Sequence, residues 1–94
     1  MPIDRALLAR AYGRPQDLRF EEAVALAKQL GFEHVRTTGS HYLFQHAKAP
    51  AVRERFPRPL NLQEGRDGKA KAYQVKQMLQ MAEAFGMISA PTED

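Results

Sequence analysis

Residues 30–46 read LGFEHVRTTGSHYLFQH, and this stretch decides the fold. It contains two short runs with aromatic and branched side chains, Phe32–Arg36 and His41–His46, which are typical of strands. The residues between the runs, Thr37–Ser40, have the composition of a turn, and Gly39 among them tolerates a positive φ. The stretch therefore predicts two consecutive strands joined by a turn.

The residues before this stretch predict two helices. In Phe20–Leu30 the apolar residues recur at helical spacing, and Gly31 follows directly, as a left-handed C-terminal cap requires. Asp17 is the best available N-cap for this helix. An earlier helix is expected over Ile3–Tyr12, where Asp4 suits the first turn. The expected apolar stripes are Phe20, Ala23, Val24, Ala27 and Leu30 in the later helix, and Ile3, Ala6, Leu7 and Ala11 in the earlier one.

The residues after the stretch predict a loop, a strand, a turn and a helix. Ala47–Pro59 contains three prolines and several charges, which favours a loop. Leu60–Gln63 alternates apolar and polar residues and predicts a third strand with one buried face. A turn at Gly65–Gly68 leads to a helix over Tyr73–Phe85. The apolar stripe of this helix is Val75, Met78, Leu79, Ala82 and Phe85.

This order predicts an α+β fold in which two helices lie on one face of a three-stranded antiparallel sheet, with an accessory helix in front. Three short strands cannot bury two faces, so the second face of the sheet is expected to stay open. We expect Leu30, Leu62, Val75 and Leu79 to be nearly fully buried. The expected division is an accessory helix and linker over residues 1–19, a domain over 20–88 and a flexible tail over 89–94.

The composition of the 94 residues excludes several classes of protein. The absence of cysteine rules out disulfides, a thiolate nucleophile and any site with cysteine ligands to a metal. No apolar stretch is long enough for a signal sequence or a membrane span, so we expect a cytoplasmic protein with no membrane association. The three histidines lack paired ligand spacing, and we expect neither a metal site nor a cofactor.

The net charge of +3 is a mild preference for polyanions, and its distribution matters more than its size. Basic residues are concentrated in the middle of the chain, which favours an edge that faces phosphate groups. They are Lys48, Arg53, Arg55, Arg58, Arg66, Lys69 and Lys71, against the acidic residues Glu54, Glu64 and Asp67.

Four segments together resemble the HicA-type toxins, which are mRNA interferases, and in particular a longer subgroup with an N-terminal extension. The segments are Leu30–Glu33 (LGFE), Gly39–His46 (GSHYLFQH), Leu60–Gln63 (LNLQ) and Gly68–Val75 (GKAKAYQV). The resemblance covers roughly residues 20–86. It implies a fold like that of the double-stranded-RNA-binding domain, ribosome-independent cleavage of mRNA without a metal, and a HicB-type antitoxin as protein partner. It also implies that His41 is the catalytic histidine.

Without the resemblance, the residues leave two interpretations of His41 open, and the turn histidine is the one they favour. A histidine can transfer protons near neutral pH, and His41 follows Gly39 and Ser40 at the start of a strand, where an RNA backbone can approach. The alternative is a histidine that hydrogen-bonds its own turn. His46 lies five positions after His41, an odd number, so the two side chains should point to opposite faces of the strand. His46 and His34 are expected to be surface or hairpin residues.

Three further residues are candidates for contact with RNA: Ser40, Lys69 and Lys71. The two lysines precede the last helix, whose N-terminal amides and positive dipole end favour phosphate. The alternative is that both lysines are merely solvated. Tyr73 either stacks on a base or packs in the core, and core packing is expected.

Three functions remain open from the sequence. The first is an endoribonuclease with His41 as general acid or base and Lys69 and Lys71 as phosphate anchors. The second is an RNA-binding module without chemistry. The third is a protein-interaction domain whose open sheet face receives an antitoxin or a second copy of the chain. Cleavage of RNA distinguishes the first from the second, and salt-dependent RNA affinity distinguishes both from the third.

Overall fold

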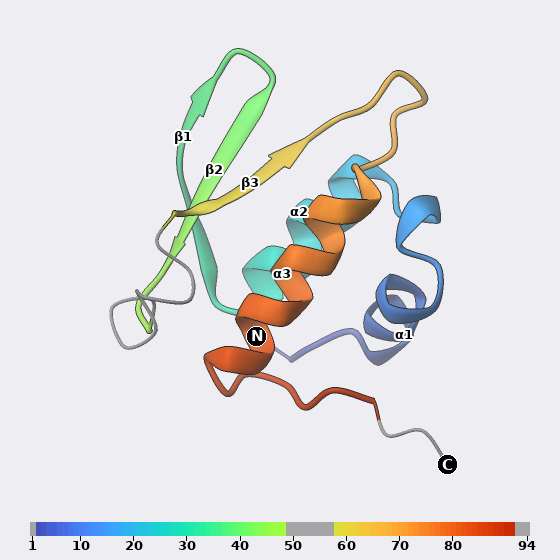
Figure 1. The fold of residues 1–94 in the computed structure, drawn as a ribbon, viewed down its shortest axis with the longest axis vertical. Coiled ribbons are helices and arrows are strands. Elements are labelled where there is room, and N and C mark those ends of the chain that lie inside the picture. Colours follow the sequence, from blue (N-terminus) through green and yellow to red (C-terminus); the bar gives the residue numbers. More distant parts are fainter. Residues whose placement is uncertain (1, 49–57, 92–94) are drawn as a thin grey trace.

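A computed structural model describes residues 2–48 and 58–91 of the chain. Its elements follow the predicted order, and the helices lie to one side of a three-stranded sheet (Figure 1). The helices are α1 (Arg5–Gly13), α2 (Phe20–Gln29) and α3 (Ala72–Ala84), with a short 3₁₀ helix at Pro15–Asp17. The strands are β1 (Phe32–Thr38), β2 (His41–His46) and β3 (Leu60–Gln63).

The sheet is antiparallel with the order β1-β2-β3, as predicted. β1 runs two residues further than expected, because an extra residue between His34 and Arg36 forms a bulge and pairing then continues to Thr38 opposite His41. The turn is correspondingly shorter and consists of Gly39 and Ser40. Gly39 has a φ of +58°, in the left-handed region that the sequence predicted for it.

Alternate residues of the strands define the two faces of the sheet. Phe44 in β2 and Leu60 and Leu62 in β3 are fully buried, and they face α2 and α3. The residues that alternate with them along each strand, such as Leu43 and Asn61, point to the other face, which none of the described helices covers (Figure 1). The prediction of helices on one face and an open second face is therefore confirmed.

The core lies between this inner face and the two main helices. The four residues expected to be nearly fully buried, Leu30, Leu62, Val75 and Leu79, have exposed fractions between 0 and 4%. Met78, a residue of the predicted stripe, and Met81 of α3 belong to the same cluster. Burial of large apolar side chains such as these is the main stabilising term in a domain of this size.

Helix α1 packs on the side of the helix layer away from the sheet (Figure 1). Asp4 is its N-cap, and its carboxylate accepts a hydrogen bond from the amide of Leu7 at 3.1 Å. Leu7, Leu8 and Ala11 are buried in the common core, whereas Ala6 of the predicted stripe is exposed. The helix begins at Arg5, and its buried side includes Leu8 in place of the predicted Ala6.

The predicted N-cap of α2 is wrong. Arg19 occupies the cap position, and its amide donates to the carboxylate of Glu22 at 3.0 Å. Asp17 belongs to the preceding 3₁₀ helix. The physical reason lies in Leu18, which is buried and whose carbonyl accepts from the amide of Ala70 at 2.9 Å. This pairing holds the chain extended up to Arg19, so the helix cannot begin earlier.

His46 is not a surface residue as predicted, because its side chain is buried at 9% exposure. Its Nε2 donates to the carbonyl of Leu30 at 3.0 Å, and its Nδ1 accepts from the amide of Lys48 at 3.1 Å. The ring also contacts Phe32 and Phe85. Both nitrogens therefore have backbone partners, which is what allows a histidine to be buried.

His34 is exposed, as predicted, and its Nε2 lies 2.9 Å from the hydroxyl of Thr37. Two sequence predictions fall partly outside the described residues. The loop expected over Ala47–Pro59 includes residues 49–57, and the tail expected over 89–94 includes residues 92–94. No helix in the described ranges 2–48 and 58–91 is long and apolar enough to cross a membrane.

Candidate functional site

His41 is the first residue of β2 and lies exposed on the open face of the sheet. It is paired in register with Thr38 of β1 and with Gln63 of β3, so it occupies the middle of the sheet at the end near the β1–β2 turn. The alternation along β2 directs His46 to the opposite, buried face. The predicted separation of the two histidines is thus confirmed, and a two-histidine acid–base pair is excluded.

Within the described part of the chain, the ring of His41 hydrogen-bonds only Asn61 of β3. The amide nitrogen Nδ2 of Asn61 lies 2.9 Å from Nδ1 of His41. Because an amide nitrogen only donates, Nδ1 is the acceptor in this contact. Nε2 has no hydrogen-bond partner among those residues, and His41 as a whole is exposed. The ring is thus held by one nitrogen and presents the other.

Asn61 has a second feature that the sequence did not indicate. Its amide oxygen Oδ1 is buried and lacks a hydrogen-bond partner among the described residues. A buried acceptor without a partner destabilises a fold by about 1–3 kcal/mol. The alternation of Leu60–Gln63 could have placed Asn61 on the face of His41, but strand register was needed to bring the two together.

Ser40 is joined to α3 by a chain of three hydrogen-bonding side chains. Its hydroxyl accepts from Nε2 of Gln63 at 3.3 Å, and Oε1 of Gln63 accepts from Nε2 of Gln74 at 3.2 Å. Oε1 of Gln74 accepts from the backbone amide of Gln63 at 2.7 Å. Gln74 therefore covers the outer edge of β3 and couples the turn beside His41 to the first turn of α3.

Gln74 is 1% exposed and was missed by sequence reasoning. A signal was present, since Gln74 lies four residues before Met78 and next to Val75, on the side of α3 that packs against the sheet. A glutamine at a buried helical position needs partners for its amide, and an unpaired strand edge supplies them.

Tyr73 does not pack in the core as expected, because it is 63% exposed. Gln74 takes the inward position in the first turn of α3, which turns the neighbouring Tyr73 toward solvent. Nε2 of Gln74 lies 3.4 Å from the Tyr73 hydroxyl. Tyr73 is thus an exposed aromatic ring next to the residue that connects α3 with Gln63.

The two candidate lysines have different surroundings. Nζ of Lys69 lies 3.7 Å from a carboxylate oxygen of Asp17, and the backbone of Lys69 forms a bridge with Arg19. Lys71 is the N-cap residue of α3, is exposed, and has no ion-pair partner among the described residues. The first turn of α3 contains no acidic residue. Lys71 is therefore the cation of the two that is free to meet a phosphate.

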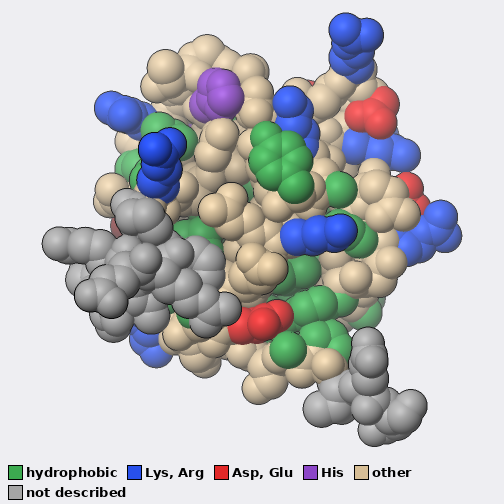
Figure 2. All heavy atoms as spheres, in the orientation of Figure 1, with side chains coloured by type: hydrophobic (Ala, Val, Ile, Leu, Met, Phe, Trp, Pro, Cys, Tyr) green, Lys and Arg blue, Asp and Glu red, His purple; other side chains and the backbone are tan. Residues whose placement is uncertain are grey.

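Hydrogen bonds link four of these side chains in a row: Ser40, Gln63, Gln74 and Tyr73. His41 lies next to this row. Figure 2 shows an exposed histidine at the end of the molecule where Figure 1 has the β1–β2 turn. Lys and Arg side chains are distributed around this face and do not form one continuous patch (Figure 2). We call the end of the open face near the β1–β2 turn the open end of the sheet. It combines a histidine, amide and hydroxyl groups, an aromatic ring and scattered positive charge.

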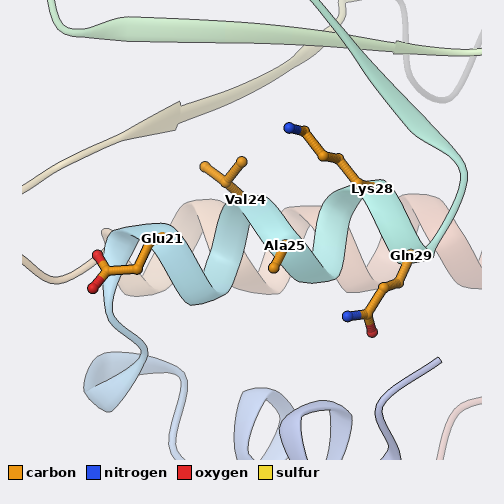
Figure 3. A pocket seen from close by; sticks show the side chains of 5 residues that line it. All are labelled: Glu21, Val24, Ala25, Lys28 and Gln29. Atoms are coloured by element: carbon orange, nitrogen blue, oxygen red, sulfur yellow. The ribbon is translucent and has the colours of Figure 1, made fainter.

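A hollow elsewhere on the surface contains none of the predicted site residues. It is lined by Glu21, Val24, Ala25, Lys28 and Gln29 of α2. Figure 3 shows Val24 and Lys28 pointing toward the side where the strands pass, and Gln29 pointing away from it. The hollow has no histidine, hydroxyl or aromatic side chain that would give it the chemistry of a reaction site.

The described residues contain no group of three or more His, Cys, Asp or Glu side chains that could hold a metal ion. We compared the chain with protein-family models, with curated proteins and with solved structures, and none of the three comparisons gave a match. The geometry of the open sheet face and the pattern of residues on it are therefore what bears on function.

Proposed function

We propose that the protein binds RNA at the open end of its sheet and cleaves it without a metal, with His41 as the proton-transferring residue. The observation that carries this proposal is the placement of His41, which is exposed on the open face and anchored through Nδ1, so that Nε2 is presented to a ligand. The resemblance of residues 39–46 to the HicA-type toxins points to the same residue.

The proposed reaction needs little equipment. The ribose 2′-oxygen attacks the adjacent phosphorus, the bond from phosphorus to the 5′-oxygen breaks, and a cyclic phosphate and a free 5′-hydroxyl result. One group takes the proton of the 2′-hydroxyl and another gives a proton to the leaving oxygen, and His41 can do either. Lys71, which is exposed at the N-terminus of α3, can offset charge on the phosphate.

The same proposal extends to the fold type and the setting. The order helix, three strands, helix, with both helices on one face, supports a fold of the double-stranded-RNA-binding type. We propose a toxin–antitoxin system in the cytoplasm, where mRNA is the substrate and a HicB-type antitoxin is the inhibitor. The open sheet face is the surface that an antitoxin, or a second copy of the chain, would cover.

One observation favours a second candidate, a module that binds RNA without cleaving it. Among the described residues the only hydrogen-bond partner of the His41 ring is the neutral amide of Asn61. Two proton transfers are needed in the reaction, and no ionisable group of the described residues hydrogen-bonds the ring to perform the second one. A binding module would use Lys71, Tyr73 and the open face in the same way and would not depend on His41.

The experiment that decides between the two uses end-labelled mRNA, purified protein and an excess of chelator. A positioned general acid or base contributes about 10²- to 10⁴-fold in rate, so His41→Ala should lose most cleavage while RNA affinity largely remains. The thermal midpoint should change by only a few degrees, because His41 is exposed. Equal cleavage by the wild type and His41→Ala rejects the catalytic assignment, and RNA binding without any cleavage by the wild type establishes the second candidate.

A further inference from the structure

Asn61 is placed where it can control the ring of His41. It lies in β3 between the buried residues Leu60 and Leu62, so its side chain shares the open face with His41. In register it is opposite Leu43, which makes it the diagonal neighbour of His41 on that face. Residues in diagonal positions of an antiparallel pair are within reach of long or ring-bearing side chains, as the 2.9 Å contact shows.

The other groups near His41 have different tasks. Gln63, directly opposite His41, uses its side-chain amide for Ser40 and Gln74. Thr38, the partner of His41 in β1, does not hydrogen-bond the ring. Of the described residues, Asn61 alone holds the ring of His41.

The stability of the fold does not explain an asparagine at this position. Oδ1 of Asn61 is buried without a partner, which destabilises the folded state. A leucine in its place would pack against Leu43 and leave no polar atom unsatisfied. The residue therefore costs stability that an apolar side chain would not, which is a common property of functional positions.

The chemistry of the side-chain amide explains why an asparagine occupies this position in spite of the lost stability. With Nδ2 directed at the ring, Nδ1 carries a lone pair and the proton of the neutral ring is on Nε2, which can then donate a hydrogen bond to a phosphate oxygen. For Nε2 to accept a proton, Nδ1 must carry one and needs an acceptor. Half a turn of the amide brings Oδ1, the atom now without a partner, to that place. The same side chain thus serves both proton distributions of the ring.

We propose that Asn61 is the positioning residue of His41: it holds the ring with Nε2 directed outward, and the orientation of its amide selects which ring nitrogen carries the proton. The catalytic part of this inference rests on the proposed cleavage of RNA. The structural part does not, because ring placement and proton position are properties of the protein without RNA.

The test uses two substitutions at Asn61 and matched controls at Gln45, an exposed residue of β2 on the same face. Asn61→Asp replaces the amide by a group that only accepts, and Asn61→Leu removes the hydrogen bond. Gln45→Asp and Gln45→Leu introduce the same side chains away from His41. Ring nitrogen and proton correlations in ¹⁵N-labelled protein without RNA report the tautomer of His41.

At a pH where the ring is neutral, the wild type should carry the proton of His41 on Nε2. Asn61→Asp should move it to Nδ1, and Asn61→Leu should leave a ring with increased motion. Both Gln45 variants should match the wild type. Identical ring spectra and relaxation in the wild type and both Asn61 variants overturn the inference, whether or not the protein cleaves RNA.

Cleavage kinetics supply the second readout. A small displacement of a reacting group can reduce a rate by about 10²-fold, so Asn61→Leu should lose about that much in kcat with little change in KM. Asn61→Asp should retain more activity than Asn61→Leu because it still holds the ring. Equal losses in Asn61→Leu and Gln45→Leu contradict a positioning role. If the wild type does not cleave RNA, the proposed function fails and the result from ring tautomers stands on its own.

Discussion

Gly31 and His46 fit each other at the point where α2 passes into β1. Gly31 has a φ of +93°, and a Cβ built on it would lie 2.7 Å from Nε2 of His46. The same nitrogen donates to the carbonyl of Leu30, next to Gly31. The glycine therefore serves two needs, a backbone conformation that other residues rarely adopt and space for a buried ring.

Gly31→Ala should lower the free energy of unfolding by about 1–3 kcal/mol, because strain in the backbone and contact with a ring held on both sides add up. Urea unfolding measures the loss. The matched control is Gly13→Ala at the end of α1, where no atom lies within 4 Å of the added Cβ and φ is not positive. An unfolding midpoint of Gly31→Ala equal to that of Gly13→Ala contradicts this account.

The sequence predicted the conformational need of Gly31 but not its relation to His46. A glycine after an apolar helical stripe is a recognisable C-terminal signal. The partners of His46 are backbone groups of Leu30 and Lys48, which any residue type would supply, so no pattern of side chains indicates them. The alternation along the strand predicted that His46 lies on the face opposite His41. Only the packing in the structure shows that this face is buried at His46.

At the scale of elements, the start of α3 brings three different groups to the edge of β3. Lys71 is the N-cap, Tyr73 is exposed, and Gln74 is bonded to Gln63. Sequence periodicity predicted the helix to within about a residue at each end, since its apolar stripe is regular. The roles of its first turn could not be predicted, because they depend on where β3 lies.

Lys71→Ala should reduce the slope of log affinity against log salt concentration by about 0.7–0.9, the contribution of one phosphate contact. Lys69→Ala should reduce it less, since Nζ of Lys69 already lies 3.7 Å from Asp17. RNA affinities at four or more salt concentrations measure both slopes. Lys76→Ala, an exposed lysine in the same helix, is the control and should not alter the slope. Slopes that change equally in Lys69→Ala and Lys71→Ala contradict the distinction between them.

At the scale of the whole molecule, α1 is tied to both of the other helices. Arg10 forms two hydrogen bonds with the carboxylate of Glu22 in α2, at 2.7 and 3.1 Å. The hydroxyl of Tyr12 donates to Glu83 of α3, and burial together with this bond raises the pKa of Tyr12. The hydrogen bonds from Arg10 and from the amide of Arg19 lower the pKa of Glu22.

This lowered pKa makes part of the stability depend on pH. A carboxyl group with a lower pKa in the folded state stabilises the fold above its unfolded value, near 4.3, and loses that contribution as pH falls through the folded value. Glu22→Gln should therefore unfold more easily than the wild type at neutral pH, by up to about 1 kcal/mol, and the difference should shrink in acid. Thermal unfolding between pH 7 and pH 3 tests this.

The exposed Glu33 of β1 provides the control for that series. Glu33→Gln should follow the wild type across the pH range more closely than Glu22→Gln does. A difference between the wild type and Glu22→Gln that stays constant down to pH 3 contradicts the assignment to ionisation of Glu22.

The layered arrangement could be deduced from the sequence because three short strands and two amphipathic helices have few ways to bury their apolar sides. The contacts of the polar groups on the open face could not be deduced in this way. Asn61 and Gln63 read only as the exposed half of an alternating strand, and their contacts with His41 and Gln74 arise from register and from a helix that follows in sequence. The sequence indicated His41 as a candidate from its residue type, but it did not indicate Asn61 as the partner of its ring.

The position of Gln74 also has a consequence for the order of events during synthesis. β2 carries His41 and β3 carries Asn61 and Gln63, but the side chain that covers the edge of β3 belongs to α3, which is translated after all of them. A nascent chain that has emerged only through Gln63 has a strand edge without its cover and a core without Val75, Met78 and Leu79. During translation the edge of β3 therefore stays uncovered until α3 has left the ribosomal exit tunnel and docked.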